Sequence, residues 1–266
     1  MEVNKFITLT TDFGLVDHYV SEMKAAILSI SPKARIVDIT HNISKFNIRM
    51  GAFILSSALD YFPKGTIHVA VVDPGVGSFR RPLLIETKKG FFIGPDNGLL
   101  VLAAEKQGIK NVYELTNINL MLNKVSNTFH GRDIFAPAAA HLLNGVTPKV
   151  FGPKTDKIKK PIFAKVIKTK KTLIGQVIHV DDFGNIITNM NLDKSLQDLY
   201  GKMLRIKLST SELQIKFCKT YSEVKLGELL VIIGSHGFLE ISANQKNAGK
   251  MLNIQPGAEI VIEISR

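Results

Sequence analysis

Hydrophobic and polar positions follow two different patterns along this chain. In the first half, short apolar runs of β type are separated by segments whose apolar residues recur at helical spacing. The strand-type runs lie at 6–11, 36–39, 66–72, 83–86 and 91–93, and the helical spacing lies at 19–29, 50–61, 98–106 and 134–143. Strands that alternate with helices in this way predict an α/β domain with a largely parallel sheet.

The second half consists of short β-type runs that are separated by turn residues. These runs lie at 164–168, 172–180, 185–188, 203–208, 213–217, 229–233, 238–242 and 259–264. Strands at this spacing predict a smaller all-β domain, either a barrel or a sandwich.

A lysine-rich stretch separates the two patterns, with eight lysines between residues 154 and 171 and prolines at 153 and 161. A charged run bounded by prolines is typical of an exposed linker. A nucleic-acid contact is the alternative, but no aromatic-interleaved basic stripe of the kind that stacks bases accompanies the run. We therefore predict an N-terminal α/β domain at residues 1–153 and a C-terminal β-barrel-like domain at residues 162–266.

Composition and charge narrow the class of protein. With 266 residues, 45% of them apolar and 21% charged, the chain has the usage of a globular protein. The apolar runs fall far short of a bilayer helix and the N-terminus lacks the pattern of a secretory signal, so we expect no membrane span and a cytoplasmic location. The single cysteine, Cys218, excludes an internal disulfide. The net charge of +11 permits an acidic partner such as nucleic acid.

Two acidic residues follow predicted strands, where ligands collect in open α/β sheets. Asp12, in the sequence TTDFG, either accepts hydrogen bonds from a ribose diol or N-caps the next turn. Asp73 follows the strand at 66–72 and precedes a Pro-Gly turn and Arg80 in the sequence VVDPGVGSFRR. Asp73 and Arg80 are either part of a ligand site or an ion pair that holds the loop. The glycines match neither a Walker loop nor a dinucleotide fingerprint.

A third candidate is His130, in the sequence TFHGRD before the helical segment at 134–143. A histidine at a helix entrance can act as an acid, a base or a ligand, or have no catalytic role. The other six histidines lack the spacing of zinc motifs, so we expect no metal cofactor.

Two polar clusters lie in the β half, VDDFGNIITN at 180–189 and GSHGFLEISAN at 234–244. Each places acid, amide or hydroxyl groups beside an aromatic ring, a set that suits a base, an ammonium group and a carboxylate. Each also fits an ordinary hairpin turn, and spacing alone does not decide between the two.

Taken together, these motifs resemble one family. TTDFG, VVDPGVGSxRR, FHGRD, DDFGNIITN and GSxGxLEI occur in this order over essentially the whole chain. In this order they are similar to the S-adenosyl-L-methionine (SAM) hydroxide adenosyltransferases, which are adenosine-forming SAM hydrolases related to SAM-dependent fluorinases and chlorinases. The resemblance implies an N-terminal α/β domain and a C-terminal β-barrel, assembled as a homotrimer with active sites between neighbouring subunits. It also implies SAM as the substrate, adenosine and L-methionine as products, no cofactor, and neither a membrane nor a nucleic-acid partner.

The resemblance further assigns roles to individual residues. Asp73, Arg80 and His130 correspond to an Asp-Arg-His set that orders and activates water. Seven further residues are matched to parts of the substrate. Asp12 and Phe46 are matched to the ribose, and Asp181 and Ser235 to the methionine end. The adenine is matched to Phe183, Asn185 and Asn244. Halogenating relatives carry an arginine where this chain has His236, so recognition of the methionine carboxylate departs from their pattern.

The implied reaction is hydrolysis of SAM by attack of water or hydroxide at ribose C5′. Methionine leaves as a neutral thioether, so the reaction needs an oriented nucleophile more than it needs acid catalysis of the leaving group. We expect Asp73 and His130 to orient the water and accept its proton, while Arg80 fixes the acid. A SAM-dependent halogenase is one alternative, although Asp73 would repel a halide. A non-catalytic SAM-binding or nucleic-acid-binding protein is the other.

Overall fold

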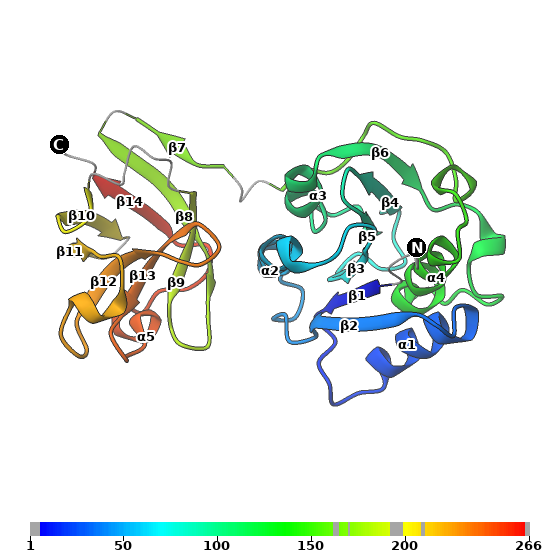
Figure 1. Ribbon diagram of the computed structural model, residues 1–266, viewed down its shortest axis with the longest axis horizontal. Helices are drawn as coiled ribbons and strands as arrows, with labels where there is room; N and C mark the ends of the chain where they lie inside the picture. The colour runs from blue at the N-terminus through cyan, green and yellow to red at the C-terminus, as the bar shows by residue number, and fades with distance from the viewer. Residues whose placement is uncertain (1–5, 162–164, 170, 192–198, 209–210, 264–266) are drawn as a thin grey trace. The chain divides into compact units, whose positions relative to one another are not determined.

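The chain folds into two compact units that divide between residues 161 and 162 (Figure 1). The computed structural model describes residues 6–161, 165–169, 171–191, 199–208 and 211–263. No helix in these ranges is long and apolar enough to cross a membrane.

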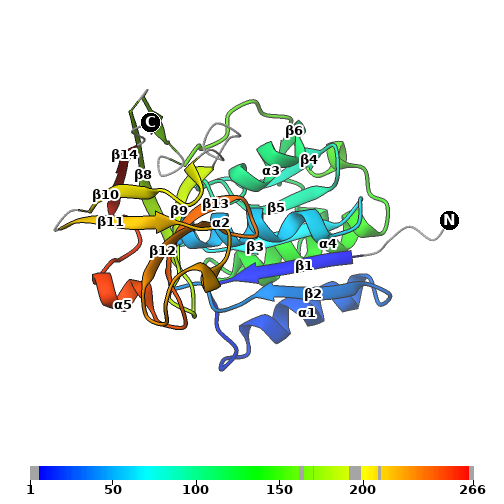
Figure 2. The same ribbon diagram turned by 60° about the vertical axis from the view of Figure 1, so that its left-hand side comes forward.

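The N-terminal unit is built on a sheet of six strands in the order β2-β1-β3-β5-β4-β6. The strands are β1 (Phe6–Thr11), β2 (Arg35–Thr40), β3 (Ile67–Val71), β4 (Pro82–Thr87), β5 (Phe91–Pro95) and β6 (Ile109–Glu114). The first four in spatial order are parallel, as β1 and β2 show in Figure 2, and β4 is antiparallel to both of its neighbours. The predicted α/β class is confirmed, and the sheet is mixed.

Helices cover the two faces of this sheet. They are α1 (Tyr19–Ile30), α2 (Ile48–Ala58), α3 (Val101–Gln107) and α4 (Ala136–Leu143). Helices α1 and α4 share one core with Ile7 and Leu9 of β1, and α2 packs beside α3 on the other side in Figure 1. The sequence pattern missed β6, because this edge strand has only one fully buried side chain, Val112, and so shows no apolar run.

The topology places three loops at one edge of the sheet. Strands β1, β2 and β3 are parallel, so the loops that leave their carboxyl ends, residues 12–18, 41–47 and 72–81, emerge at the same edge. These loops contain Asp12, Phe46, Asp73 and Arg80.

The C-terminal unit is a closed barrel of seven strands, β8 to β14, because β14 pairs with β8 as well as with β10. The strands are β8 (Thr172–Val180), β9 (Ile186–Asn191), β10 (Met203–Leu208), β11 (Ser211–Phe217), β12 (Leu229–Ile233), β13 (Phe238–Ala243) and β14 (Glu259–Glu263). A two-residue strand, β7 (Ile167–Lys168), pairs with β8 in antiparallel orientation, and a short helix, α5 (Ala248–Leu252), precedes β14. The barrel prediction is confirmed; parts of the runs predicted at 164–168 and 259–264 lie outside the described residues.

The first part of the lysine-rich stretch is tied to the N-terminal unit. Arg81 pairs with Asp96 and donates to Thr155 Oγ1 at 3.0 Å and to the carbonyl of Lys157, and the Lys159 amide donates to Asp96 Oδ1 at 2.8 Å. The lysine side chains between 154 and 160 are exposed. The lysine side chains are therefore solvated, as in a linker, but the backbone of this segment is docked.

Candidate active site

The turn after β3 holds a buried ion pair. Arg80 Nε donates to Asp73 Oδ1 at 3.0 Å and to Oδ2 at 2.8 Å, and Arg80 Nη2 lies 2.5 Å from Oδ2. The side chains are only 9% and 5% exposed, and the guanidinium lies over the ring of Phe135. Ions so poorly hydrated are tolerated only when geometry and further hydrogen bonds compensate for the lost water.

Arg80 also binds His130, fifty residues away in sequence. Arg80 Nη2 lies 2.8 Å from His130 Nδ1. A guanidinium only donates hydrogen bonds, so Nδ1 must be the acceptor, and the proton of the neutral ring is then on Nε2. Burial and the neighbouring Arg80 lower the pKa of His130 below its usual value of 6.5, although Asp73 and Asp133 act in the opposite direction. His130 is therefore a neutral ring at pH 7.

A glycine lets the Asp73 loop approach the loop before His130. Gly77 has a φ of +76°, and a Cβ at this position would lie 2.3 Å from the carbonyl oxygen of Asn127. A side chain there would be strained and would force the two loops apart. Gly77 is therefore needed for Arg80 to reach His130.

A second buried carboxylate braces the His130 loop. Asp133 is fully buried and accepts hydrogen bonds from Arg132 Nε at 2.6 Å and from the Ser126 amide at 2.7 Å. Arg132 also donates to Glu22 of α1 at 2.9 Å, and these bonds raise its pKa. The backbone at Gly131–Phe135 is a π-helix, an irregularity frequent at functional sites. Sequence reasoning missed this role of Asp133, although its FHGRD motif contained the signal.

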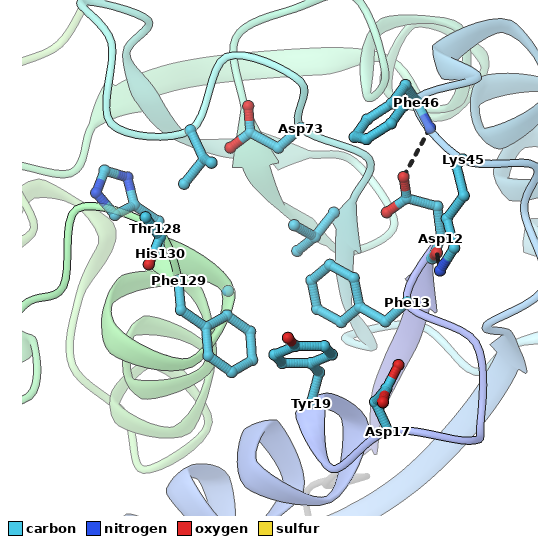
Figure 3. Close-up of a pocket in the computed structure, with 13 residues that line it drawn as sticks. Asp12, Phe13, Asp17, Tyr19, Lys45, Phe46, Asp73, Thr128, Phe129 and His130 are labelled. Atoms are coloured by element: carbon cyan, nitrogen blue, oxygen red, sulfur yellow. Dashed lines mark hydrogen bonds between the residues drawn. The ribbon is translucent and has the colours of Figure 1, made fainter.

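Asp12 joins the loops that follow β1 and β2. Its Oδ2 accepts the amide of Phe46 at 2.8 Å, and Lys45 Nζ donates to its carbonyl at 2.6 Å (Figure 3). Asp12 therefore does not cap α1, whose N-cap residue is His18. Phe46 has a φ of +64°, a conformation that costs a residue other than glycine about 1 kcal/mol or more, and its ring is exposed at the pocket.

These residues surround one pocket of about 340 Å³. Asp12, Phe46, Asp73 and His130 all line it, and Arg80 is hydrogen-bonded to two of them. Sequence reasoning missed several other lining residues: Phe13, Asp17, Tyr19, Lys45, Thr128 and Phe129. Most of them lie within or close to the TTDFG and FHGRD motifs, so their position near a motif could have indicated that they line the site.

The barrel carries a separate pocket of about 920 Å³, lined in part by Phe183, Asn185 and Asn244. Asp181 fixes Asn185, since its carboxylate accepts from the Asn185 amide at 2.8 Å and from Nδ2 at 2.9 Å. The Phe183 ring is exposed. The structure therefore brings together the three residues that the resemblance matched to adenine.

Ser235 is not among the residues that line this pocket. Its Oγ lies 3.3 Å from Nδ1 of His236 in the turn between β12 and β13. The buried Glu240 of β13 was also missed; burial and the nearby Asp181 carboxylate raise the pKa of Glu240 to about 7. Glu240 is therefore an acidic neighbour of Asp181, which belongs to the 180–189 cluster.

In the ranges that the structure describes, no three His, Cys, Asp or Glu side chains are grouped so that they could hold a metal ion. The N-terminal pocket offers a fixed carboxylate, a guanidinium and a neutral imidazole. Together these groups can position and deprotonate a small nucleophile.

Comparisons with known proteins agree across both units. The family model described as SAM hydroxide adenosyltransferase N-terminal domain matches residues 7–152, and the corresponding C-terminal domain model matches residues 175–261. A curated protein of Methanocaldococcus jannaschii named (R)-S-adenosyl-L-methionine hydrolase is 43% identical, over 98% of this chain and 97% of its own.

Two further similarities are informative. The crystal structure of an uncharacterized conserved protein from Thermotoga maritima matches with a TM-score of 0.91 and 38% identity, over 96% of this chain and 99% of that one. A fluorinase of Actinopolyspora mzabensis is more distant, at 24% identity over 96% of this chain and 95% of its own.

Proposed function

Because this chain belongs to the SAM hydroxide adenosyltransferase family over both of its units, we propose that it hydrolyses SAM to adenosine and L-methionine. The observation that carries the proposal is the hydrogen-bonded set of Asp73, Arg80 and His130 at a pocket that also contains Asp12. The curated relative's name specifies the R configuration, and we propose that this chain prefers the same epimer at sulfur.

In the proposed reaction a water oxygen attacks ribose C5′ in line with the C5′–S bond. The C5′–O bond forms as the C5′–S bond breaks, and its electron pair leaves on sulfur as the neutral thioether of methionine. Asp73 accepts the proton of the water. His130 offers an Nε2–H and so orients the nucleophile oxygen as a donor, which changes the base role expected for it from the sequence. Arg80 holds both groups and stabilises hydroxide character.

Substrate contacts follow the family resemblance. Asp12 keeps its second carboxylate oxygen for the ribose hydroxyls, with Phe46 beside the sugar. The barrel residues divide between the two ends of the substrate: Phe183, Asn185 and Asn244 for adenine, and Asp181 and Ser235 for the methionine end. His236 provides weaker recognition of a carboxylate than the arginine of halogenating relatives would, because an imidazole lacks the two-pronged donor geometry of a guanidinium.

A homotrimer with active sites at subunit interfaces is part of the proposal. Exposed apolar side chains in the loops after β1, β2 and β3 support it: Leu15, Val16, Phe46 and Phe79. Exposed apolar groups at the edge of a site are typical of a surface that a partner covers.

The decisive experiment is hydrolysis of each SAM epimer by the purified protein in ¹⁸O-water, without metal or halide. We expect equal amounts of adenosine and methionine, faster release from the R epimer, and ¹⁸O in the 5′-hydroxyl of adenosine. Asp73→Asn serves as the control. Intact SAM that still raises the melting temperature would make the protein a binder. In a parallel assay with high chloride, formation of 5′-chloro-5′-deoxyadenosine would make it a halogenase.

A further inference from the structure

Three aromatic rings form one corner of the N-terminal pocket. The centroids of Phe13, Tyr19 and Phe129 lie 5.3 to 5.9 Å apart in edge-to-face pairs, and we call them the aromatic corner. Each ring comes from a different element: the loop after β1, the start of α1 and the loop before His130. Gly131 makes room for two of them, because its Cβ would lie 3.3 to 3.4 Å from Phe129 and Phe13.

The charges around the pocket favour a cation. Three carboxylates line it, those of Asp12, Asp17 and Asp73. Lys45 lines it too, with its Nζ bonded to the carbonyl of Asp12, and Arg80 is paired with Asp73, so two of the three negative charges are balanced and one remains. Aromatic faces add to this preference, since the ring quadrupole attracts cations.

The geometry of displacement places a cation near these rings. In an in-line attack the nucleophile, the reacting carbon and the leaving atom lie on one line, so the leaving sulfur is on the far side of the carbon from the nucleophile. Asp73 and His130 stand at one side of the pocket, and the rings of Phe13 and Tyr19 lie across it from Asp73 in Figure 3. A sulfonium attacked from the Asp73 side therefore faces the aromatic corner.

We propose that the aromatic corner, above all Phe13 and Tyr19, recognises the sulfonium cation of the substrate and rejects its uncharged thioether analogue. This inference rests on the proposed function. Arg132 already lies over the ring of Phe129, at 4.9 Å, so Phe129 has less to contribute. The corner makes the pocket selective for SAM over S-adenosylhomocysteine, which differs at sulfur by one methyl group and the positive charge.

The test compares the two ligands by calorimetry, with Asp73→Asn as the background to prevent turnover. Tyr19→Leu and Phe13→Leu keep apolar volume and remove the ring, so we expect SAM to bind roughly 2- to 30-fold more weakly while S-adenosylhomocysteine changes less than about twofold. Tyr19→Phe is the matched control, because it keeps the ring and should retain the preference for SAM.

Two results would overturn the inference. One is an equal loss for both ligands in both leucine variants, which would mean that the corner only packs against the substrate. The other is a loss in Tyr19→Phe as large as that in Tyr19→Leu, which would assign the effect to the hydroxyl. Hydrolysis by the unmodified enzyme is scored separately, so failure of the proposed function is distinguished from failure of this inference.

Discussion

At the scale of single residues, Arg80 connects the candidate catalytic groups. It contacts Asp73 through two nitrogens and His130 through one. Its remaining nitrogen, Nη1, is buried and has no hydrogen-bond partner within the described residues. Such a donor is rare in proteins, and the structure does not place it at the pocket, because Arg80 is not among the lining residues.

Arg80→Lys should lower kcat by roughly 10²–10⁴-fold, because a lysine keeps the charge but cannot bridge a carboxylate and an imidazole with fixed planar geometry. Steady-state kinetics on SAM would measure the effect. Arg81→Lys is the matched control, since the neighbouring Arg81 binds Asp96 and the docked segment, and it should retain kcat. Equal kcat values in the two variants would contradict the role of Arg80.

The pH dependence of kcat should follow the lowered pKa of His130. Protonation would place a proton on Nδ1, remove the acceptor of the Arg80 bond and set two cations side by side. Because this pKa is lowered from its usual 6.5, we expect kcat to be retained to a lower pH than an unshifted histidine would allow, and to fall as the pH drops further. Stability should fall in the same direction, since the unfolded chain takes up the proton first.

Proton NMR titration of the ring of His130, assigned with His130→Asn, measures this pKa directly. A midpoint above 6.5 would show that the Asp73 and Asp133 charges outweigh burial and Arg80, and the neutral tautomer inferred for His130 would then be wrong.

At the scale of elements, the site depends on where strands end. The loops after β1, β2 and β3 meet because these strands are parallel, and the π-helix at Gly131–Phe135 places His130 opposite the Asp73 turn. Asp133 and Arg132 fasten that π-helix to α1 through Glu22. The chemistry is therefore held by two irregular segments on a rigid sheet.

Gly77→Ala should reduce both stability and activity, because the new methyl group meets the Asn127 carbonyl and the residue keeps a positive φ. We expect a loss of about 1–3 kcal/mol in the free energy of unfolding, measured in urea, and a lower kcat. Gly75→Ala, in the same turn, meets side-chain atoms alone, the Ser78 hydroxyl at 3.3 Å, Arg80 Cγ at 3.5 Å and Asp73 Oδ1 at 3.9 Å, and should stay within about 0.5 kcal/mol in stability. Equal stability of the two variants would show that the loops can separate without cost.

At the scale of the whole molecule, each of the two units has its own hydrophobic core and its own pocket. The N-terminal unit carries the Asp73 pocket and the barrel carries the Phe183 pocket. Each has its own buried apolar cluster. The proposed reaction needs groups from both, so assembly is a question for the full chain rather than for either unit alone.

Light scattering after gel filtration should give about three times the 29.4 kDa mass of the chain. Phe79→Ser places a hydroxyl in the exposed apolar loop after β3 and should shift the mass toward the monomer. Tyr61→Ser is the control, because this exposed ring follows α2 and precedes β3, at the other end of the strand. A monomer in the unmodified protein would remove the trimer from the proposal.

Some of this protein was determined by its sequence alone. The buried strand β3 could be predicted because it is a continuous apolar run, and the helix α1 because burial on one face makes its apolar residues recur at helical spacing. Asp12 and Asp73 could be singled out because each follows a predicted strand, where ligands collect in open α/β sheets. The edge strand β6 was not, since it buries too little to leave a pattern.

Tertiary structure alone decided how the candidates meet. Neither the bond from Arg80 to His130, fifty residues apart, nor the tautomer it imposes follows from local spacing. The same holds for the aromatic corner, whose rings come from three elements, and for the docking of residues 154–159 on Arg81 and Asp96. Sequence periodicity reports how each segment is buried, whereas these features depend on which segments the fold brings together.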